Sequence, residues 1–178
     1  VLSLAVLWWL WEDQAPRAAG WIGFAWGAGA FLTGTYWLYI SIHVFGEAPL
    51  AVAIFLMLGL VAIMALYPAV TGYLCARAGA SGALRWLLLL PGSWVLTEWL
   101  RGWVASGFPW LSLGYSQTDG WLGGFAPLGG VYGISLAVAL LAGALMALLR
   151  GGTRDRIAAV ALAAAILATG FAADLRSW

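Results

Sequence analysis

The stretch PLAVAIFLMLGLVAIMALYPAVTGYLCA, residues 49–76, contains no charged side chain. As an α-helix it would be roughly 42 Å long, whereas about 20 apolar residues are enough to cross the hydrocarbon core of a bilayer. The stretch therefore predicts a membrane-spanning helix, and the rest of the chain must fit the same class of protein.

The composition of the whole chain agrees with a membrane protein. Of its 178 residues, 64% are hydrophobic and 8% are charged, whereas soluble domains carry about 25% charged residues. Eight arginines and seven acidic residues are too few to cover the surface of a water-soluble protein of this size. This excludes a soluble enzyme and a disordered region, and the net charge of +1 offers no basic face for nucleic acid.

Five further apolar segments flank this stretch. The first begins within an apolar run and is interpreted as the end of a truncated helix; the others are long enough to span a bilayer. The expected segments are 1–11, 20–42, 49–76, 84–104, 127–149 and 157–173. Within 20–42, Gly23 and Gly27 have the GxxxG spacing of closely packed membrane helices. The sequence predicts an all-α fold, a polytopic transmembrane helix bundle with about six membrane segments, in which residues 1–178 form one transmembrane domain fragment.

The arginines indicate how the bundle is oriented. If the segments alternate in direction, the connections at 12–19, 77–85 and 150–156 share one side of the membrane. That side carries six of the eight arginines: Arg17, Arg77, Arg85, Arg150, Arg154 and Arg156. Because arginine favours the cytoplasmic side, we expect this side to be cytoplasmic and the C-terminal residues 174–178 to be extracytoplasmic.

The connection at residues 102–126, here called the aromatic loop, is much longer than the others. It holds six glycines and the aromatic residues Trp103, Phe108, Trp110, Tyr115 and Trp121. A loop of this length without an evident helix is usually functional or disordered, and aromatic content argues against disorder. Because Trp and Tyr favour the headgroup level, we expect the loop to lie in the outer membrane interface, partly re-entrant.

Glu98 and Arg101 lie three residues apart near the end of segment 84–104, so their side chains share one face of a helix. A charged residue costs roughly 2.5–3.5 kcal/mol at the centre of a span and less near its end. Two interpretations stay open. The pair is either a structural ion pair that ties the helix to the aromatic loop or a contact for a polar group of a substrate.

The aromatic loop holds four further candidates for substrate binding, in GFPW at 107–110 and GYSQ at 114–117. They are Phe108, Trp110, Tyr115 and Gln117. A proline turn, aromatic faces and one amide suit a wall that meets acyl chains on one side and headgroups on the other. The alternative is an aromatic belt that only anchors the bundle.

The residues supply no catalytic constellation and no metal site. One cysteine and one histidine exclude a disulfide framework and a Cys/His zinc site. We expect His43 to make an interfacial hydrogen bond and Cys75, within an apolar run, to be a small packing residue.

Two stretches carry a resemblance to a known family. The longer contains TEWLRGW at 97–103, GFPW at 107–110, GYSQ at 114–117 and GGV at 129–131; the shorter runs from WG at 26–27 to FG at 45–46. Both resemble the membrane domain of the apolipoprotein N-acyltransferases. The resemblance implies eight membrane helices with an extracytoplasmic nitrilase-like domain before the last. This chain would hold most of the second helix through the seventh.

The same resemblance implies a function. In that family, catalytic Glu, Lys and Cys residues of the nitrilase-like domain pass an acyl chain from phospholipid to the N-terminal diacylglyceryl-cysteine of an apolipoprotein in the bacterial inner membrane. The present chain has no lysine, and its Cys75 lies on the opposite face, so alone it would be inactive. The expected partners are therefore a phospholipid donor, a diacylglyceryl-modified apolipoprotein and the bilayer, with no cofactor. The six candidates would line the lipid entrance.

Two other interpretations of the chain remain. A small transporter or channel would place polar residues at mid-membrane depth or show inverted repeats, and no internal repeat is evident. A non-catalytic membrane scaffold needs no catalytic set. The residues that follow Trp178 would separate the three, because the acyltransferase interpretation requires a nitrilase-like domain there.

Overall fold

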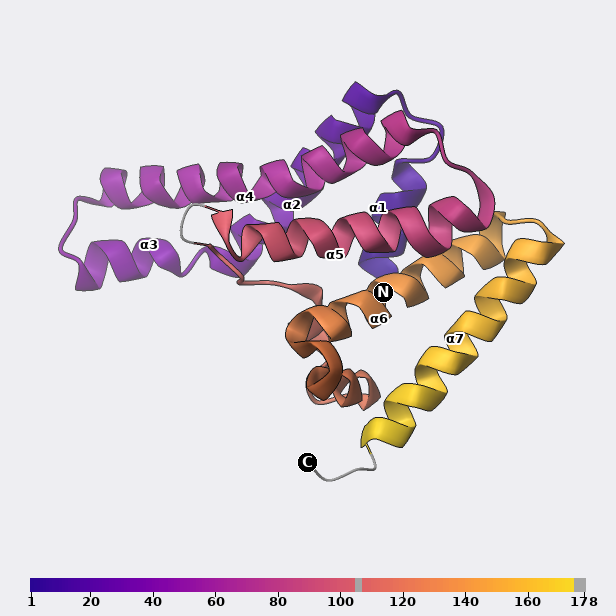
Figure 1. Cartoon of the computed structure of the whole chain (residues 1–178). Coiled ribbons are helices and arrows are strands. Elements are labelled where there is room, and N and C mark those ends of the chain that lie inside the picture. Colours follow the sequence, from indigo (N-terminus) through magenta and orange to yellow (C-terminus); the bar gives the residue numbers. More distant parts are fainter. Residues whose placement is uncertain (105–106, 175–178) are drawn as a thin grey trace.

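The computed structural model describes residues 1–104 and 107–174, and the regular elements in these ranges are helical (Figure 1). The predicted all-α class is confirmed. Three of the described helices are long and apolar enough to cross a membrane: Leu50–Ala78, Trp121–Arg150 and Thr153–Ala173. The chain is a multi-pass membrane protein built as a helix bundle.

Six helices of at least two turns make up the bundle. They are α1 (Leu2–Leu10), α2 (Pro16–Thr35), α4 (Leu50–Ala78), α5 (Leu90–Arg101), α6 (Ala126–Arg150) and α7 (Thr153–Asp174). The shorter elements are α3 (Leu38–Ile40), the π-helical η1 (Ser41–Phe45) and η2 (Leu84–Leu89), and the 3-10 helices η4 (Leu113–Gln117) and η5 (Trp121–Phe125). Because a bilayer supplies no water to the backbone, each apolar segment satisfies its own peptide groups by coiling.

Helices α2 and α4 pack closely through glycine. Gly23 and Gly27 are buried on the face of α2 that meets α4. A Cβ atom on Gly27 would lie 2.5 Å from Cγ of Pro68 and 3.0 Å from Cα of Ala65, closer than side chains can approach. The GxxxG spacing thus marks a close helix contact, as expected.

Helix α6 packs against α1, α5 and α7. Its buried face is rich in small residues, among them Ala139, Ala142, Gly143 and Ala147. A Cβ atom on Gly143 would overlap the carbonyl oxygen of Trp86, so the backbones of α6 and η2 meet directly there. Small residues let α6 hold its neighbours by close van der Waals contact, which replaces the hydrophobic effect within a membrane.

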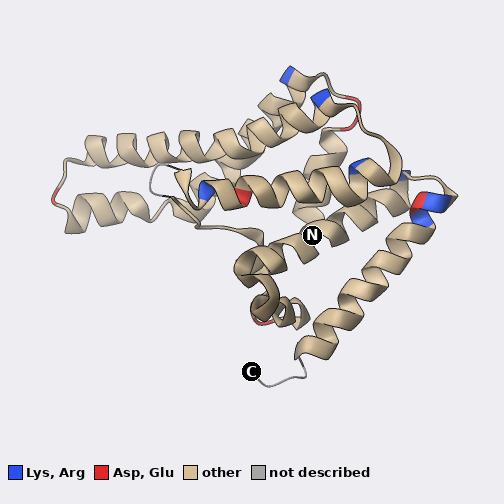
Figure 2. Ribbon diagram, viewed as in Figure 1, with Lys and Arg blue, Asp and Glu red and all other residues tan. Residues whose placement is uncertain are grey.

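The three arginine-bearing connections lie together at one end of the bundle (Figure 2). Glu12, between α1 and α2, pairs with Arg150 at the end of α6, at 2.7 Å. Asp155, in the first turn of α7, accepts a hydrogen bond from the backbone N–H of Ala83 at 3.1 Å. These contacts link all three connections, which is the arrangement that alternating segments require.

Two expected segments differ from the structure. Segment 20–42, expected as one helix, breaks after Thr35 and continues as α3 and η1. The aromatic loop, expected without elements of its own, contains η4 and η5. Residues 105–106 of this loop and the tail at 175–178, for which an extracytoplasmic position is predicted, lie outside the described residues.

Candidate functional site

The candidate site lies where α5 ends and the aromatic loop folds back over the ends of α2 and α5 and over the middle of α4. Glu98 and Arg101 occupy the last turn of α5, and they are only 5% and 3% exposed. Charged side chains are almost never buried this deeply unless they are paired or fully hydrogen-bonded. Their partners therefore indicate what this part of the molecule is built to do.

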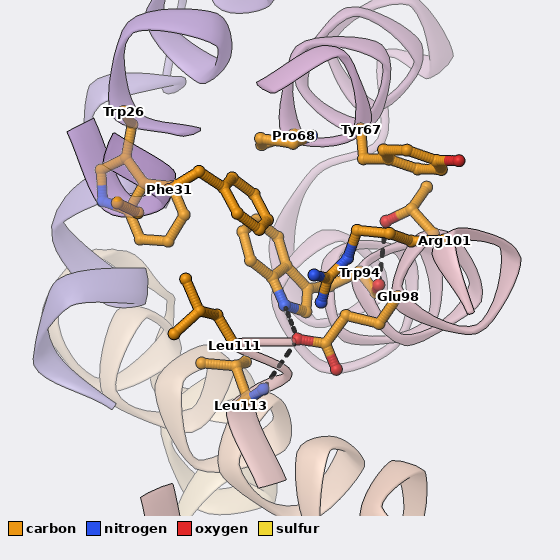
Figure 3. Close-up of a pocket in the computed structure, with 11 residues that line it drawn as sticks. Trp26, Phe31, Tyr67, Pro68, Trp94, Glu98, Arg101, Leu111 and Leu113 are labelled. Atoms are coloured by element: carbon orange, nitrogen blue, oxygen red, sulfur yellow. Dashed lines mark hydrogen bonds between the residues drawn. The ribbon is translucent and has the colours of Figure 1, made fainter. Parts of the chain in front are cut away.

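Arg101 binds the main chain of the aromatic loop. Its Nη1 donates hydrogen bonds to the carbonyl oxygen of Phe108, at 3.2 Å, and to that of Trp110. Its Nη2 donates to Oγ of Ser112 at 3.1 Å. The guanidinium carbon also lies 5.1 Å from the ring centroid of Phe31 on α2 (Figure 3). The planar fork of arginine thus fixes three alternate residues of the loop against the bundle.

Glu98 binds the loop a few residues further along. Its Oε1 accepts hydrogen bonds from Nε1 of Trp94, at 3.1 Å, and from the backbone N–H of Leu113, at 2.9 Å (Figure 3). Its Oε2 is buried and accepts no hydrogen bond from the described residues. A carboxylate that accepts a backbone N–H makes a strong, charge-assisted bond.

Glu98 and Arg101 do not form an ion pair with each other. Among the described residues, the carboxylate–arginine pair in direct contact is Glu12 with Arg150. The expectation of a direct ion pair is therefore wrong, because each side chain instead turns towards main-chain groups of the loop. The expected tie between α5 and the loop does exist, and two separate sets of hydrogen bonds make it.

Replacing Glu98 by Gln tests whether this tie needs a charge. The amide oxygen can keep both bonds, so we expect Glu98→Gln to change the unfolding free energy by less than about 1 kcal/mol, whereas Glu98→Ala should cost about 2–4 kcal/mol by stranding two buried donors. Thermal unfolding of the two variants measures the difference. Equal losses for Gln and Ala would show that the negative charge itself holds the loop.

Leu111 shows that the loop is held under strain. Its φ is +61°, a left-handed conformation that costs a bulky residue about 1–3 kcal/mol. The bonds of Arg101 to Trp110 and Ser112 fix the residues on both sides of it. This backbone turn packs the side chain of Leu111 against Gly34 on α2, where a Cβ atom would lie 2.8 Å from Cδ2. Strain of this kind persists where the surroundings determine the backbone, as they do at functional sites.

A small cavity lies beneath the loop, between α2, α4 and α5 (Figure 3). Its volume is about 60 Å³, and its walls include Phe31, Tyr67, Glu98, Arg101 and Leu111. Since one water needs about 10–15 Å³ of such space, the cavity has room for a few waters and is too small for an acyl chain. A lipid chain would have to bind elsewhere.

An apolar groove on the loop itself has a suitable size. Pro109, Trp110, Leu111 and Tyr115 line this groove, whose volume is about 410 Å³. Trp110 and Tyr115 are 50% and 53% exposed. Phe108 stacks on Trp110 with ring centroids 5.5 Å apart and also packs on the core between α2 and α4. We call these four lining residues the loop groove.

The structure does not gather all six predicted residues at one place. Glu98, Arg101, Phe108, Trp110 and Tyr115 belong to the connected region formed by the tie and the loop groove. Gln117 lies in η4 and faces a different hollow, and its Nε2 donates to the carbonyl oxygen of the preceding Ser116 at 2.7 Å. Whether any of the six binds substrate remains a prediction.

Comparison with known proteins identifies the family. The family model of the apolipoprotein N-acyltransferase N-terminal domain matches residues 1–144, which include α1 to α5 and the aromatic loop. The chain belongs to the apolipoprotein N-acyltransferase family. A relative named apolipoprotein N-acyltransferase, from Chromobacterium violaceum, is 46% identical over 165 residues, 92% of this chain and 32% of the relative. Relatives of the same name from Vibrio parahaemolyticus and Methylococcus capsulatus are 48% and 42% identical, over 82% and 93% of this chain. The chain spans about a third of the length of these curated relatives.

Sequence reasoning missed two serines that complete this part of the chain. Ser112 joins the tie by accepting from Arg101 and donating to the carbonyl oxygen of Pro109 at 2.9 Å. Ser135, fully buried on α6, accepts a hydrogen bond from the N–H of Gly114 at 2.8 Å. For Ser135, a lone serine in an apolar span was the available signal, because a buried hydroxyl needs a partner.

His43 and Cys75, the one histidine and the one cysteine of the chain, have hydrogen-bonding partners in the structure. Nδ1 of His43 lies 2.7 Å from the carbonyl oxygen of Ala48, at the turn before α4. Cys75 is buried between α4 and α5, with its Sγ 3.0 Å from Oγ of Ser93. Both agree with the structural roles expected for them.

Proposed function

We propose that this chain is membrane machinery of an enzyme that moves an acyl chain from a phospholipid to the N-terminal diacylglyceryl-cysteine of lipoproteins, and that its loop groove receives the lipid substrates. One observation carries the proposal. The loop groove is an exposed apolar surface on a strained loop that two buried charged residues hold in place. The name that the relatives share, apolipoprotein N-acyltransferase, supports the reaction class.

The physical task of the membrane helices follows from the substrates. Both the donor phospholipid and the lipidated acceptor keep their acyl chains in the bilayer, so they must be captured at its surface. Trp110 and Tyr115 have amphipathic rings that favour the headgroup level and can contact the first methylenes of a chain. Because Arg101 and Glu98 fix the loop in advance, little ordering is left for the lipid to impose.

The covalent chemistry belongs to residues outside this chain. By the family resemblance, a Cys thiolate attacks the ester carbonyl of the phospholipid, a C–S bond forms, and the C–O bond breaks to release a lysophospholipid, which takes up a proton. The free amine of the acceptor then attacks the thioester, which forms the C–N bond and releases the thiolate. The amine proton passes to a general base of the nitrilase-like domain. Two steps through a thioester replace one difficult transfer. The present chain holds the substrates in position.

The proposed orientation follows from the charges. The linked arginine-bearing connections face the cytoplasm of a bacterium, and the loop groove lies at the opposite surface of the inner membrane. The buried Glu98 and Arg101 lie at the loop side of the bundle, away from most of the arginines (Figure 2). The acyl-accepting cysteine of a lipoprotein would therefore meet the loop on the extracytoplasmic surface.

Truncating the groove aromatics tests the proposal. We expect Trp110→Ala with Tyr115→Ala, in the full-length enzyme, to raise the KM for phospholipid by tenfold or more while leaving folding intact, because both side chains are half exposed. Acyl transfer from phospholipid vesicles to a diacylglyceryl-cysteine peptide gives the readout. Phe55→Ala is the matched control, since Phe55 is an aromatic residue on α4 that is 73% exposed. Unchanged KM in the double variant, or an equal rise in the control, would refute lipid capture by the groove.

A further inference from the structure

We propose a second lipid site, on the opposite end of the bundle from the loop groove, where α2 and α4 bind an anionic phospholipid. The site combines an apolar groove between the two helices with two arginines at its mouth. It requires no acyl transfer and so goes beyond the function proposed above.

The groove runs between α2 and α4 near the arginine-bearing end of the bundle. Its volume is about 390 Å³. The lining residues are Arg17, Gly20, Trp21 and Phe24 on α2, and Leu66, Ala69, Val70 and Tyr73 on α4. At Gly20 the two helices lie in ordinary contact range, since a Cβ atom there would lie 3.6 Å from Cβ of Tyr73. Apart from Arg17 and the hydroxyl of Tyr73, the walls offer hydrocarbon contacts that suit an acyl chain.

Two cations stand at the mouth of this groove. Arg17 lies one helical turn from Gly20, and Arg77 lies one turn from Tyr73, so both are one turn from the point where the helices meet. Nη1 of Arg77 lies within 3.4 Å of the Tyr73 hydroxyl, which holds the guanidinium beside the groove. Figure 2 shows basic residues close together where α2 begins and α4 ends.

The charge of these two arginines is not neutralised within the described residues. Neither of them pairs with a carboxylate there, whereas Arg150 pairs with Glu12 and Arg85 donates to the carbonyl oxygen of Trp11. Arg17 and Arg77 are both exposed. The end of the groove therefore offers two free guanidinium groups at the depth where a span meets the headgroups.

The ligand that matches both parts is a glycerophospholipid with a net negative headgroup. Its phosphodiester meets the guanidinium groups, and one acyl chain lies along Phe24, Leu66 and Val70. Arginines near a membrane surface attract anionic lipids, and basic pockets between membrane helices bind acidic headgroups. A zwitterionic lipid would bring its own cation to the arginines, and inorganic phosphate would leave the groove empty.

Native mass spectrometry of the full-length protein in detergent, titrated with phosphatidylglycerol, tests the site. We expect Arg17→Gln with Arg77→Gln to weaken binding of the first lipid by about thirtyfold, which corresponds to about 2 kcal/mol for the two arginines together. The control is Arg154→Gln with Arg156→Gln. It removes the same charge from two exposed arginines at the same end of the bundle and should change binding by less than twofold. Equal losses in the two double variants would overturn the site in favour of unspecific attraction.

Two further arms separate a lipid site from a simple anion site. Val70→Trp keeps both arginines but fills the groove, because Val70 lines it and is half exposed; we expect it to weaken phosphatidylglycerol binding as well. Inorganic phosphate at millimolar concentration should not displace the lipid, and phosphatidylcholine should bind no better to the wild type than to the Arg17/Arg77 variant. Lipid binding that survives Val70→Trp, or competition by phosphate, would refute the proposal.

Discussion

Replacing Arg101 by Ala is expected to free the aromatic loop from the bundle and to lower the unfolding free energy by about 3–5 kcal/mol. The change strands the carbonyl oxygens of Phe108 and Trp110 and takes one of two hydrogen bonds from the hydroxyl of Ser112, and each acceptor left without a donor costs about 1–3 kcal/mol. Arg101→Lys should recover little of this, because one ammonium group cannot reproduce the fork that reaches three acceptors.

Thermal unfolding and limited digestion by chymotrypsin measure the two parts of this prediction. The melting temperature should fall, and cleavage after the loop aromatics Trp110 and Tyr115 should become faster at temperatures where the helices persist. Arg154→Ala is the control, since Arg154 is exposed at the opposite end of the bundle. If Arg101→Ala melts and digests like the wild type, the hydrogen bonds of Arg101 do not hold the loop.

Replacing Gly27 by Leu is expected to separate α2 from α4 and to cost about 3 kcal/mol or more. The new side chain would start 2.5 Å from Cγ of Pro68 and 3.0 Å from Cα of Ala65, and a backbone atom cannot move aside as a side chain can. Because Phe31 on α2 stacks under Arg101, the shift should also loosen the aromatic loop.

Gly29 provides a matched control for this prediction. It lies on the same helix, two residues further on, and a Cβ atom there would meet nothing within 4 Å. Gly29→Leu should therefore leave the melting temperature within a degree or two of the wild type, and Gly27→Ala should fall between the two leucine variants. Equal melting temperatures for the two leucine variants would show that α2 and α4 are not held at this distance by glycine.

The helical architecture could be predicted because a bilayer couples composition directly to structure. An apolar run such as 49–76 has to satisfy its own peptide groups, and a helix does so within a single segment. The break after Thr35 was not predictable in this way, since residues 36–42 are as apolar as those before them. There the backbone changes to the turns of α3 and η1 without any charge or proline within 36–42 to announce it.

At the candidate site, residue types could be predicted better than their partners. Helical spacing correctly indicated that Glu98 and Arg101 share a face and tie α5 to the loop. Spacing could not show that each side chain bonds to backbone groups 7 to 15 residues away. Nearly every residue has such backbone groups, so the sequence does not indicate which of them will be the partners. The left-handed turn at Leu111 was equally hidden, since leucine rarely adopts it.

Arg101 and Glu98 grip carbonyl and amide groups that nearly every amino acid possesses, so the course of the loop is largely independent of the side chains that it displays. Proline at 113 is the exception, because it has no N–H to give to Glu98. Evolution, or a saturation library at the exposed positions 110 and 115, can therefore exchange the displayed chemistry while the scaffold stays constant. The architecture separates foldability from selectivity in the way that antibody frameworks do.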